Sequence, residues 1–260
     1  MLDLIYVHVD ITSNAVLSKG ITHYDFVRSV VHKPKNLLLL NPYAEDGEYE
    51  RHSGLKIIRG LDNVNQHFSD AGRRRKGEEI KWMDFSDIAM LKELTPLEIS
   101  ELLYFGHTKT SLHSPFFYKL QNNFVFFEFA DQMTRVYYRY IDEFYQILAD
   151  KISSVILEKV NDKKSFFRRG VSVDKLSSDL LKEMKPILQE GVVFCFQNIE
   201  QQGKEYRIPI YMIEDSLWKT KNYAYKEDPI IASLVYNTGK RTWHFENNGE
   251  ALDIQLPKHA

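Results

Sequence analysis

Residues 123–140, NFVFFEFADQMTRVYYRY, determine the fold that we expect at the centre of this chain. Two runs of aromatic and β-branched residues, NFVFFEF and TRVYYRY, flank a short polar turn near Ala130-Asp131-Gln132, and this pattern predicts a β-hairpin. Both faces of each predicted strand are apolar or aromatic, so other parts of the folded molecule have to cover both of them.

The stretch from Tyr104 to Tyr145 holds fourteen Phe and Tyr residues, more than a solvent-washed hairpin carries. Such a density of rings has to be buried in a core, in a ligand groove or against another subunit. Burial between two layers of the same chain is favoured, and contact with a second subunit or another protein is the alternative. In the alternative, a partner surface would be formed by Phe124, Phe126, Tyr137 and Tyr138, and the protein could be a homo-oligomer.

The N-terminal region predicts alternating strands and helices. Strand patterns at residues 2–11, 36–41, 55–60 and 78–85 enclose two helix patterns, one opened by the capping pair Thr22 and Asp25 and one over residues 62–68. The resulting β-α-β-β-α-β order is compatible with a split βαβ sandwich. We expect a small α/β region over residues 1–85.

A helical connector is expected over residues 86–122. Ser86 can cap one helix, and Thr95, Pro96 and Glu98 form a capping box that opens a second one ending near Gly106. Ser114 and Pro115 open a third, short helix. The polar residues between Gly106 and Ser114 therefore predict a loop.

Residues 123–260 predict a domain of hairpins and helices. An apolar stripe from Ile141 to Ile156 indicates an amphipathic helix, and Ser172 opens another one that ends at Gly191. Two further hairpins pair VVFCFQ with EYRIPIYMI and RTWHFE with ALDIQL, and DPIIASLVYN between them carries helical cap and stop signals. The whole chain thus predicts an α+β fold, and the three regions could pack as one body.

Composition limits the classes of protein. The chain has 260 residues, 43% of them apolar, and no apolar run long enough to span a membrane. Its single cysteine lies in the apolar run VVFCF, and its formal net charge is −2. We expect a soluble, cytoplasmic protein without a membrane partner and without general attraction to nucleic acid.

The strongest local signal for an anion is the run GRRRKG. Arg73, Arg74, Arg75 and Lys76 could contact a phosphate backbone, joined in space by Arg168 and Arg169 beside the Phe166-Phe167 pair. An exposed turn and a solvated hinge explain the same residues. Nucleic acid is therefore a possible partner but not the favoured one.

A weaker signal for a metal lies on the first strand. Alternation puts His8 and Asp10 on one face, where they could share a metal or a proton with His107 in a metal-assisted hydrolase. A partly exposed polar face explains the same pair. The phosphate-binding loop, the dinucleotide fingerprint, the nucleophile elbow and paired-cysteine zinc patterns are all missing, so the sequence identifies no cofactor.

These observations favour a non-catalytic binding or regulatory protein that acts through its aromatic-rich region. Binding of nucleic acid or phosphate through the basic runs, and a metal-assisted hydrolase, are the two alternatives.

Overall fold

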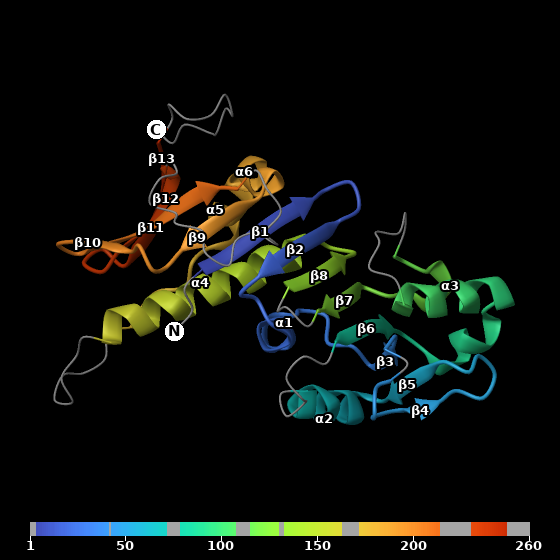
Figure 1. The fold of residues 1–260 in the computed structure, drawn as a ribbon. Helices are drawn as coiled ribbons and strands as arrows, with labels where there is room; N and C mark the ends of the chain where they lie inside the picture. Colours follow the sequence, from blue (N-terminus) through green and yellow to red (C-terminus); the bar gives the residue numbers. More distant parts are fainter. Residues whose placement is uncertain are drawn as a thin grey trace. The chain divides into compact units, whose positions relative to one another are not determined.

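The computed structural model confirms an α+β fold (Figure 1). It describes residues 4–41, 43–71, 79–107, 115–129, 133–162, 172–213 and 230–248. The chain forms two compact units: unit 1 consists of Met1–Val9, Leu17–Ile21 and Phe144–Ala260, and unit 2 of Asp10–Val16 and Thr22–Glu143. Residues 86–122 belong to unit 2, so the predicted divisions at residues 85 and 122 do not coincide with the boundaries of these units.

The strands of unit 2 lie in the order β8-β7-β6-β3-β5-β4 and all five pairs in this series are antiparallel. Their bounds are β3 (Asn36–Leu39), β4 (Glu48–Tyr49), β5 (Lys56–Arg59), β6 (Ile80–Phe85), β7 (Phe124–Glu128) and β8 (Met133–Tyr138). The register of β7 and β8 places Phe124 opposite Tyr138 and Phe126 opposite Val136. The predicted central hairpin is confirmed.

The helices of unit 2 are α1 (His23–Ser29), α2 (Leu61–Ala71), η1 (Ile88–Glu93), α3 (Pro96–His107) and η2 (Tyr118–Leu120). The Asp25 carboxylate accepts hydrogen bonds from Thr22 N at 2.9 Å and from Thr22 Oγ1 at 3.0 Å, which fixes the start of α1. Thr95 and Glu98 exchange the reciprocal bonds of a capping box at the start of α3. The cap of η1 is Asp87, one residue beyond the predicted Ser86.

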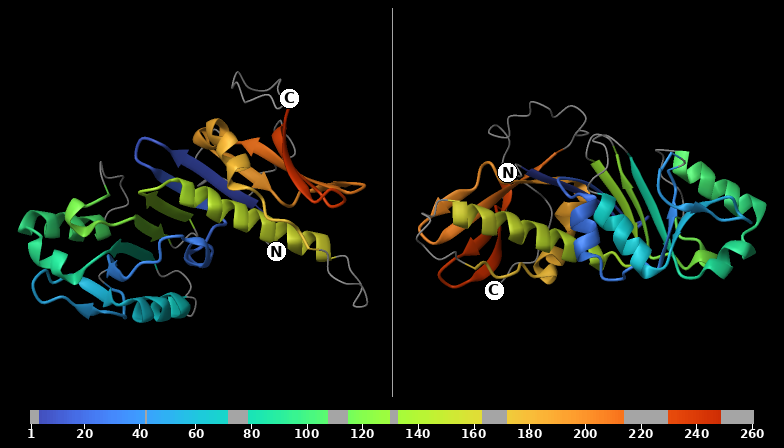
Figure 2. Two further views of the ribbon diagram at one scale, coloured as in Figure 1. Left: turned by 180° about the vertical axis from the view of Figure 1, so that it is seen from behind. Right: turned by 90° about the horizontal axis from the view of Figure 1, so that it is seen from below.

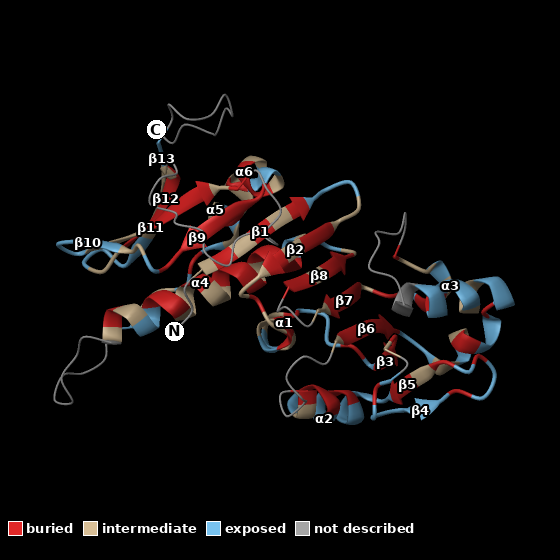
Figure 3. Ribbon diagram, in the orientation of Figure 1, coloured by how far each residue is buried: buried red, intermediate tan, exposed pale blue. Residues whose placement is uncertain are grey.

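One face of the central hairpin packs against aromatic side chains of α1 and β6. The Phe26 ring of α1 lies 4.8 Å from the rings of Phe124 and Phe126, and Trp82 of β6 stacks on Phe126 at 5.3 Å. Tyr138 contacts Phe26 on the same face. These side chains are buried (Figure 3).

The other face of the hairpin packs against η1, α3 and η2. Val125, Phe127 and Tyr137 share a hydrophobic cluster with Leu91 and Leu102. Both faces are thus covered by unit 2 itself, as the favoured interpretation of the sequence expects. The alternative, a partner surface formed by four aromatic rings, is not possible in this fold. Each of these side chains is 3% exposed or less, which leaves no ring surface for a partner: Phe124, Phe126, Tyr137 and Tyr138.

The strands of unit 1 follow the order β13-β12-β11-β9-β1, with β10 paired to β11. Their bounds are β1 (Leu4–Asp10), β9 (Val192–Cys195), β10 (Glu200–Gln202), β11 (Glu205–Met212), β12 (Ile230–Asn237) and β13 (Thr242–Asn247). Strand β2 (Ala15–Lys19) divides between the units after Val16. Pairing of β9 with β11 is confirmed, whereas the partner predicted for β13, ALDIQL, lies outside the described residues.

The helices of the C-terminal part are α4 (Asp142–Asp162), α5 (Ser178–Glu183) and α6 (Lys185–Glu190). Helix α4 confirms the predicted amphipathic helix and lies across one face of the unit 1 strands in each view (Figure 2). Cys195 of β9 is buried, as its apolar neighbours indicate.

Three predictions about secondary structure and strand pairing are wrong. The β-α-β-β-α-β order does not form its own sandwich, because β1 pairs with β9 from the C-terminal part of the chain. Residues 230–237 form strand β12 and not a helix, since β11 and β13 hydrogen-bond to both of its edges. The helix expected from Ser172 begins at Ser178, capped by Ser177, and it is divided at Met184 before Pro186.

No helix in the described ranges is both long and apolar enough to cross a membrane.

Candidate functional site

A cavity in the described part of unit 2 opens between β4, β5 and α2 and has a volume of about 370 Å³. This volume lies within the usual range for small-molecule sites. The lining residues are Asp46, Gly47, Glu48, Ile57, Ile58, Arg59, Asn63, Gln66, His67 and Asp70, which we call the α2 pocket.

Helix α2 supplies the polar wall of the α2 pocket. Asn63, Gln66, His67 and Asp70 recur at the i, i+3, i+4, i+7 spacing that places them on one side of a helix. The adjacent stripe, which includes Val64 and Phe68, is buried and attaches α2 to the sheet. The wall is therefore held in place by packing directly beneath it.

His67 connects this wall to the loop before β4. Its Nδ1 lies 3.2 Å from Oδ2 of Asp46, and its side chain is only 2% exposed whereas that of Asp46 is 53% exposed. The imidazole packs edge-on against Trp82, with ring centroids 5.6 Å apart. A buried ring thus positions a carboxylate that still faces solvent.

Gly47 allows the loop to pass close to β5. Its φ is +87°, and a Cβ atom there would lie 2.9 Å from the carbonyl oxygen of Ile57 and from Cδ1 of Leu39. Only glycine fits this conformation and this contact without strain. The close approach brings Asp46 and Glu48 to the pocket from the strand side.

The α2 pocket is acidic. It contains three carboxylates, from Asp46, Glu48 and Asp70, and one guanidinium, from Arg59. Arg59 Nε lies 2.6 Å from Glu48 Oε1, and Gln66 Nε2 donates to Asp70 Oδ2 at 2.6 Å. Asp46 and Asp70 supply the other two carboxylates of the lining, one from the loop before β4 and one from α2.

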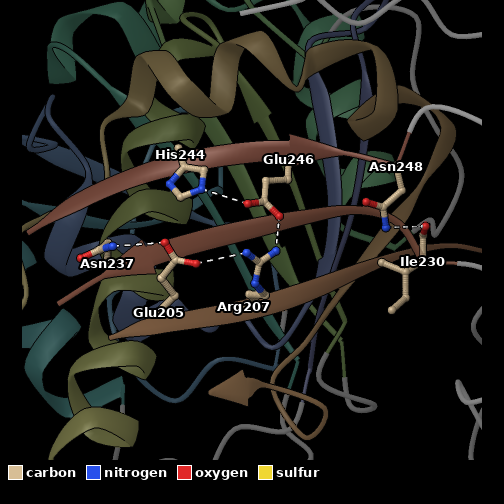
Figure 4. Close-up of polar contacts among 7 residues, drawn as sticks. All are labelled: Glu205, Arg207, Ile230, Asn237, His244, Glu246 and Asn248. Atoms are coloured by element: carbon tan, nitrogen blue, oxygen red, sulfur yellow. Dashed lines mark hydrogen bonds and ion pairs between the residues drawn. The ribbon is translucent and has the colours of Figure 1, made fainter. Parts of the chain in front are cut away.

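A second polar cluster covers one face of β11, β12 and β13 in unit 1, and we call it the polar sheet face (Figure 4). Arg207 pairs with Glu205 at 3.1 Å and also with Glu246 of β13. His244 Nε2 lies 3.1 Å from the second oxygen of Glu246, and Asn237 donates to Glu205 at 3.1 Å. The five side chains form one connected network across three strands.

The pKa values within the polar sheet face agree with this pairing. Hydrogen bonds from Asn237 and then from Arg207 lower the pKa of Glu205. Burial acts to lower the pKa of Arg207, but its hydrogen bond to Glu246 and the nearby negative charges raise it. Glu205 and Arg207 are therefore both charged at neutral pH.

The opposite face of the same strands holds the segment before α5. Tyr236 accepts a hydrogen bond from Asp174 N at 3.2 Å, and Trp243 Nε1 donates to the carbonyl oxygen of Asp174 at 2.7 Å. Leu176 N donates to Ser153 Oγ of α4 at 2.9 Å. These contacts keep residues 172–177 non-helical and explain why α5 starts later than its sequence predicts.

The predicted metal residues are placed as follows. His8 is half-buried and Asp10 is exposed, on the less buried face of β1 as alternation predicts. The Asp10 carboxylate accepts from Thr12 N at 2.9 Å and from Ser13 Oγ at 2.6 Å, so it closes its own turn. The His107 side chain lies outside the described residues, and among those described no group of three His, Cys, Asp or Glu side chains suits a metal ion.

The hydrolase stays a hypothesis on these observations. The anion-binding hypothesis is equally untested, because Arg73, Arg74, Arg75, Lys76, Arg168 and Arg169 all lie outside the described residues.

The α2 pocket was missed by our interpretation of the sequence. Its helical wall has a recognisable signal, a polar residue at each of positions 63, 66, 67 and 70, on the side of α2 next to its apolar stripe. Its strand wall has none, because Asp46 and Glu48 lie in an acidic stretch that resembles any exposed loop.

Comparison with known proteins found no matching family model, no similar curated protein and no similar solved structure. The function therefore has to be argued from the geometry of the chain alone.

Proposed function

We propose that the protein is a binding protein that takes a small organic cation, an amine of a few carbon atoms, into the α2 pocket. The observation that carries the proposal is the acidic lining of a cavity of about 370 Å³, with Asp46 held by the buried ring of His67. Such cavities with a few convergent polar groups are the usual form of a small-molecule site.

The chemistry of the lining supports a cationic ligand. Carboxylates bind ammonium groups through short, charge-assisted hydrogen bonds that are about twice as strong as neutral ones. Asp46 comes from the loop before β4 and Asp70 from α2, so carboxylates line the pocket on two sides. Ile58 of β5 adds an apolar side chain to the lining.

The remaining polar side chains of the pocket add selectivity. Asn63 Nδ2 donates to the Arg59 carbonyl oxygen at 2.8 Å, which fixes the amide at the start of α2. Arg59, paired with Glu48, disfavours a second positive charge at that end of the pocket. A ligand with its cationic end toward Asp46 and Asp70 fits this distribution best.

The proposed function is still that of a non-catalytic binding protein, as the sequence suggests. The binding site, however, is the α2 pocket and not the aromatic-rich central hairpin. The central hairpin supports the pocket indirectly. Its Phe126 stacks on Trp82, and Trp82 in turn packs against the His67 ring.

Isothermal titration of the full chain with a series of small primary amines tests the proposal. The matched uncharged alcohols serve as ligand controls. We expect an amine to bind and the alcohol of the same size not to bind. Replacement of Asp70 by Asn should weaken binding about tenfold or more, because one hydrogen bond to a charged group is lost.

Asp62→Asn is the matched control, because Asp62 lies on the same helix but outside the pocket lining. It should leave the affinity within about twofold, as expected for an exposed carboxylate whose charge is distant from the ligand. The α2 pocket would be ruled out as the site if no amine bound, or if Asp62→Asn and Asp70→Asn lost equal amounts of affinity for the amine.

A further inference from the structure

The segment after α1 places an exposed imidazole against a buried carboxylate. Nδ1 of His32 lies 2.5 Å from Oε1 of Glu143, the second residue of α4, and both residues belong to unit 2. The side chain of His32 is 51% exposed, whereas that of Glu143 is 9% exposed. One side of the ring is therefore open to solvent, while Nδ1 faces a buried oxygen.

This contact determines which ring nitrogen is reactive. A neutral imidazole carries one proton, and the hydrogen bond made by one nitrogen decides where that proton lies. Because an ionised carboxylate only accepts hydrogen bonds, Nδ1 of His32 carries the proton and Nε2 keeps a lone pair. Nε2 stands at the free end of the half-exposed ring, so it is the nitrogen that a reagent in solution meets.

The position of Glu143 favours its negative charge. Glu143 lies in the first turn of α4, a helix of 21 residues, where the helix dipole stabilises a carboxylate. Burial, and then the charge of Glu143, raise the pKa of the Tyr138 phenol well above its usual value. Tyr138 therefore keeps its proton and adds no second negative charge. A buried carboxylate at Nδ1 stabilises the positive charge that an imidazole acquires when Nε2 bonds to an electrophile.

The other described pairs of a histidine with a carboxylate differ from this one. His23 and His67 also turn Nδ1 toward a carboxylate, but both rings are buried. His244 contacts Glu246 through Nε2 itself, and that carboxylate is partly exposed. The pair of His32 and Glu143 combines an accessible Nε2 with a buried carboxylate, which is the arrangement of an activated histidine.

The chain around His32 carries positive charge. Arg28, Lys33 and Lys35 are exposed, and the sequence has no Asp or Glu between Phe26 and Ala44. Clustered cations raise the local concentration of anionic reagents. Among electrophiles, this surrounding favours an anionic phosphoryl donor over a neutral acyl donor.

We propose that His32 is a phosphoryl acceptor whose Nε2 takes a phosphoryl group from a small acyl phosphate. Nε2 attacks the phosphorus atom, an N–P bond forms, and the P–O bond to the acyl oxygen breaks, so that the carboxylate leaves with the bonding electrons. The ring becomes cationic in this step, and its Nδ1–H stays bonded to Glu143. His32 is the acceptor and Glu143 is a positioning residue. This inference does not depend on the α2 pocket, because neither residue lines that cavity.

Incubation of the full chain with acetyl phosphate provides the first test. Peptide mass spectrometry at neutral pH, where phosphohistidine survives, locates the phosphoryl groups, and inorganic phosphate, which has no leaving group, is the reagent control. His52, an exposed histidine of unit 2, is the internal reference. We expect His32 to be labelled about tenfold or more faster than His52, as one hydrogen bond to a charged group predicts.

Glu143→Gln provides the second test. It keeps the size of the side chain and an oxygen that accepts from Nδ1 but removes the charge, so the ratio of labelling at His32 to labelling at His52 should fall about tenfold. Glu158→Gln is the matched control, because it removes an exposed carboxylate from the far part of the same helix. It should leave the ratio unchanged.

Three results would overturn the proposal: no phosphoryl group on His32 of the wild type, equal rates at His32 and His52, or an unchanged ratio in a folded Glu143→Gln variant. Circular dichroism shows whether that variant folds. If it does not fold, the comparison of His32 with His52 in the wild-type protein decides.

Discussion

Replacement of Asp84 should reveal how a buried carboxylate stabilises the start of β7. Asp84 lies on β6 and is 3% exposed. Its oxygens accept hydrogen bonds from Asn123 N at 2.7 Å, Phe124 N at 2.8 Å and Asn123 Nδ2 at 2.9 Å. The carboxylate therefore serves two backbone N–H groups at the point where the pairing of β6 with β7 ends.

The magnitude follows from the groups left without partners. Asp84→Ala leaves the N–H groups of Asn123 and Phe124 without this acceptor, and each such loss costs about 1–3 kcal/mol when the group is buried. Since Asn123 is only partly buried, we expect the free energy of unfolding to fall by about 3–4 kcal/mol. Asp84→Asn keeps an oxygen for the two N–H groups and should cost about 1 kcal/mol.

The sign of the pH dependence separates charge from hydrogen bonding. Burial raises the pKa of Asp84, and the hydrogen bonds from Phe124 and Asn123 oppose this only in part. The folded state therefore binds the proton more tightly than the unfolded state, whose pKa is about 3.9. The contribution of Asp84 to stability is greatest below this unfolded pKa and decreases as the pH rises through the folded pKa.

Urea unfolding of the wild type, Asp84→Ala and Asp84→Asn measures both effects. The advantage of the wild type over Asp84→Asn should shrink as the pH rises through this window. Equal stability of the Ala and Asn variants at neutral pH would refute the hydrogen-bond argument, and a wild-type advantage that grows with pH would refute the assigned direction of the pKa.

Two further predictions concern the α2 pocket and the basic runs. Gly47→Ala should lower the free energy of unfolding by about 2–3 kcal/mol, against about 1 kcal/mol for Gly60→Ala. Both glycines have positive φ, but only at Gly47 does a backbone atom lie within 3 Å of the added Cβ. Chemical denaturation of the two variants measures the difference, and equal losses of stability would contradict the steric argument. Nucleic-acid binding through the basic runs should depend steeply on salt: the logarithm of the affinity should fall as the logarithm of the salt concentration rises. The residues concerned are Arg73, Arg74, Arg75, Lys76, Arg168 and Arg169, and replacing residues 73–76 by Gln should flatten that slope. Binding that is independent of salt in a filter assay would exclude this function.

The elements that the sequence predicts correctly are those whose signal is local. The central hairpin has its two aromatic runs and its turn within one continuous stretch, and the helices α1 and α3 are opened by capping partners at i and i+3. Such interactions form between neighbours along the chain, so no knowledge of distant residues is needed to expect them.

Strand β12 shows why a local signal can fail. The helical cap and stop signals lie at the ends of DPIIASLVYN, whereas the residues between them are mostly β-branched or aromatic and fully suited to a strand. Position between β11 and β13 decides the outcome, because both edges of the backbone find partners there. The residues that supply those partners are remote from the cap signals.

The aromatic side chains of the hairpin strands β7 and β8 are buried as expected, whereas Tyr104, Tyr118 and Tyr140 of the same stretch are exposed. The sequence leaves open what buries the hairpin. Phe26 comes from α1 and Trp82 from β6, and both elements precede the hairpin that they cover by a long stretch of chain. Patterns within the hairpin predict that a covering layer exists, and only the sheet order identifies it. A partner surface and an internal core therefore give the same sequence pattern.

The α2 pocket depends on the same kind of distant contact. The polar stripe of α2 is visible in the sequence, but a stripe of this kind on an exposed helix is usually only solvated. The polar stripe of α2 becomes part of a pocket because of the strands beside it. Strand β5 leads directly into α2, and β4 pairs with β5 so that Glu48 lies opposite Ile57. The glycine that permits this return, Gly47, makes Asp46 available to His67. The pocket is thus the product of one hairpin register and one positive φ angle, neither of which the composition of the acidic loop predicts.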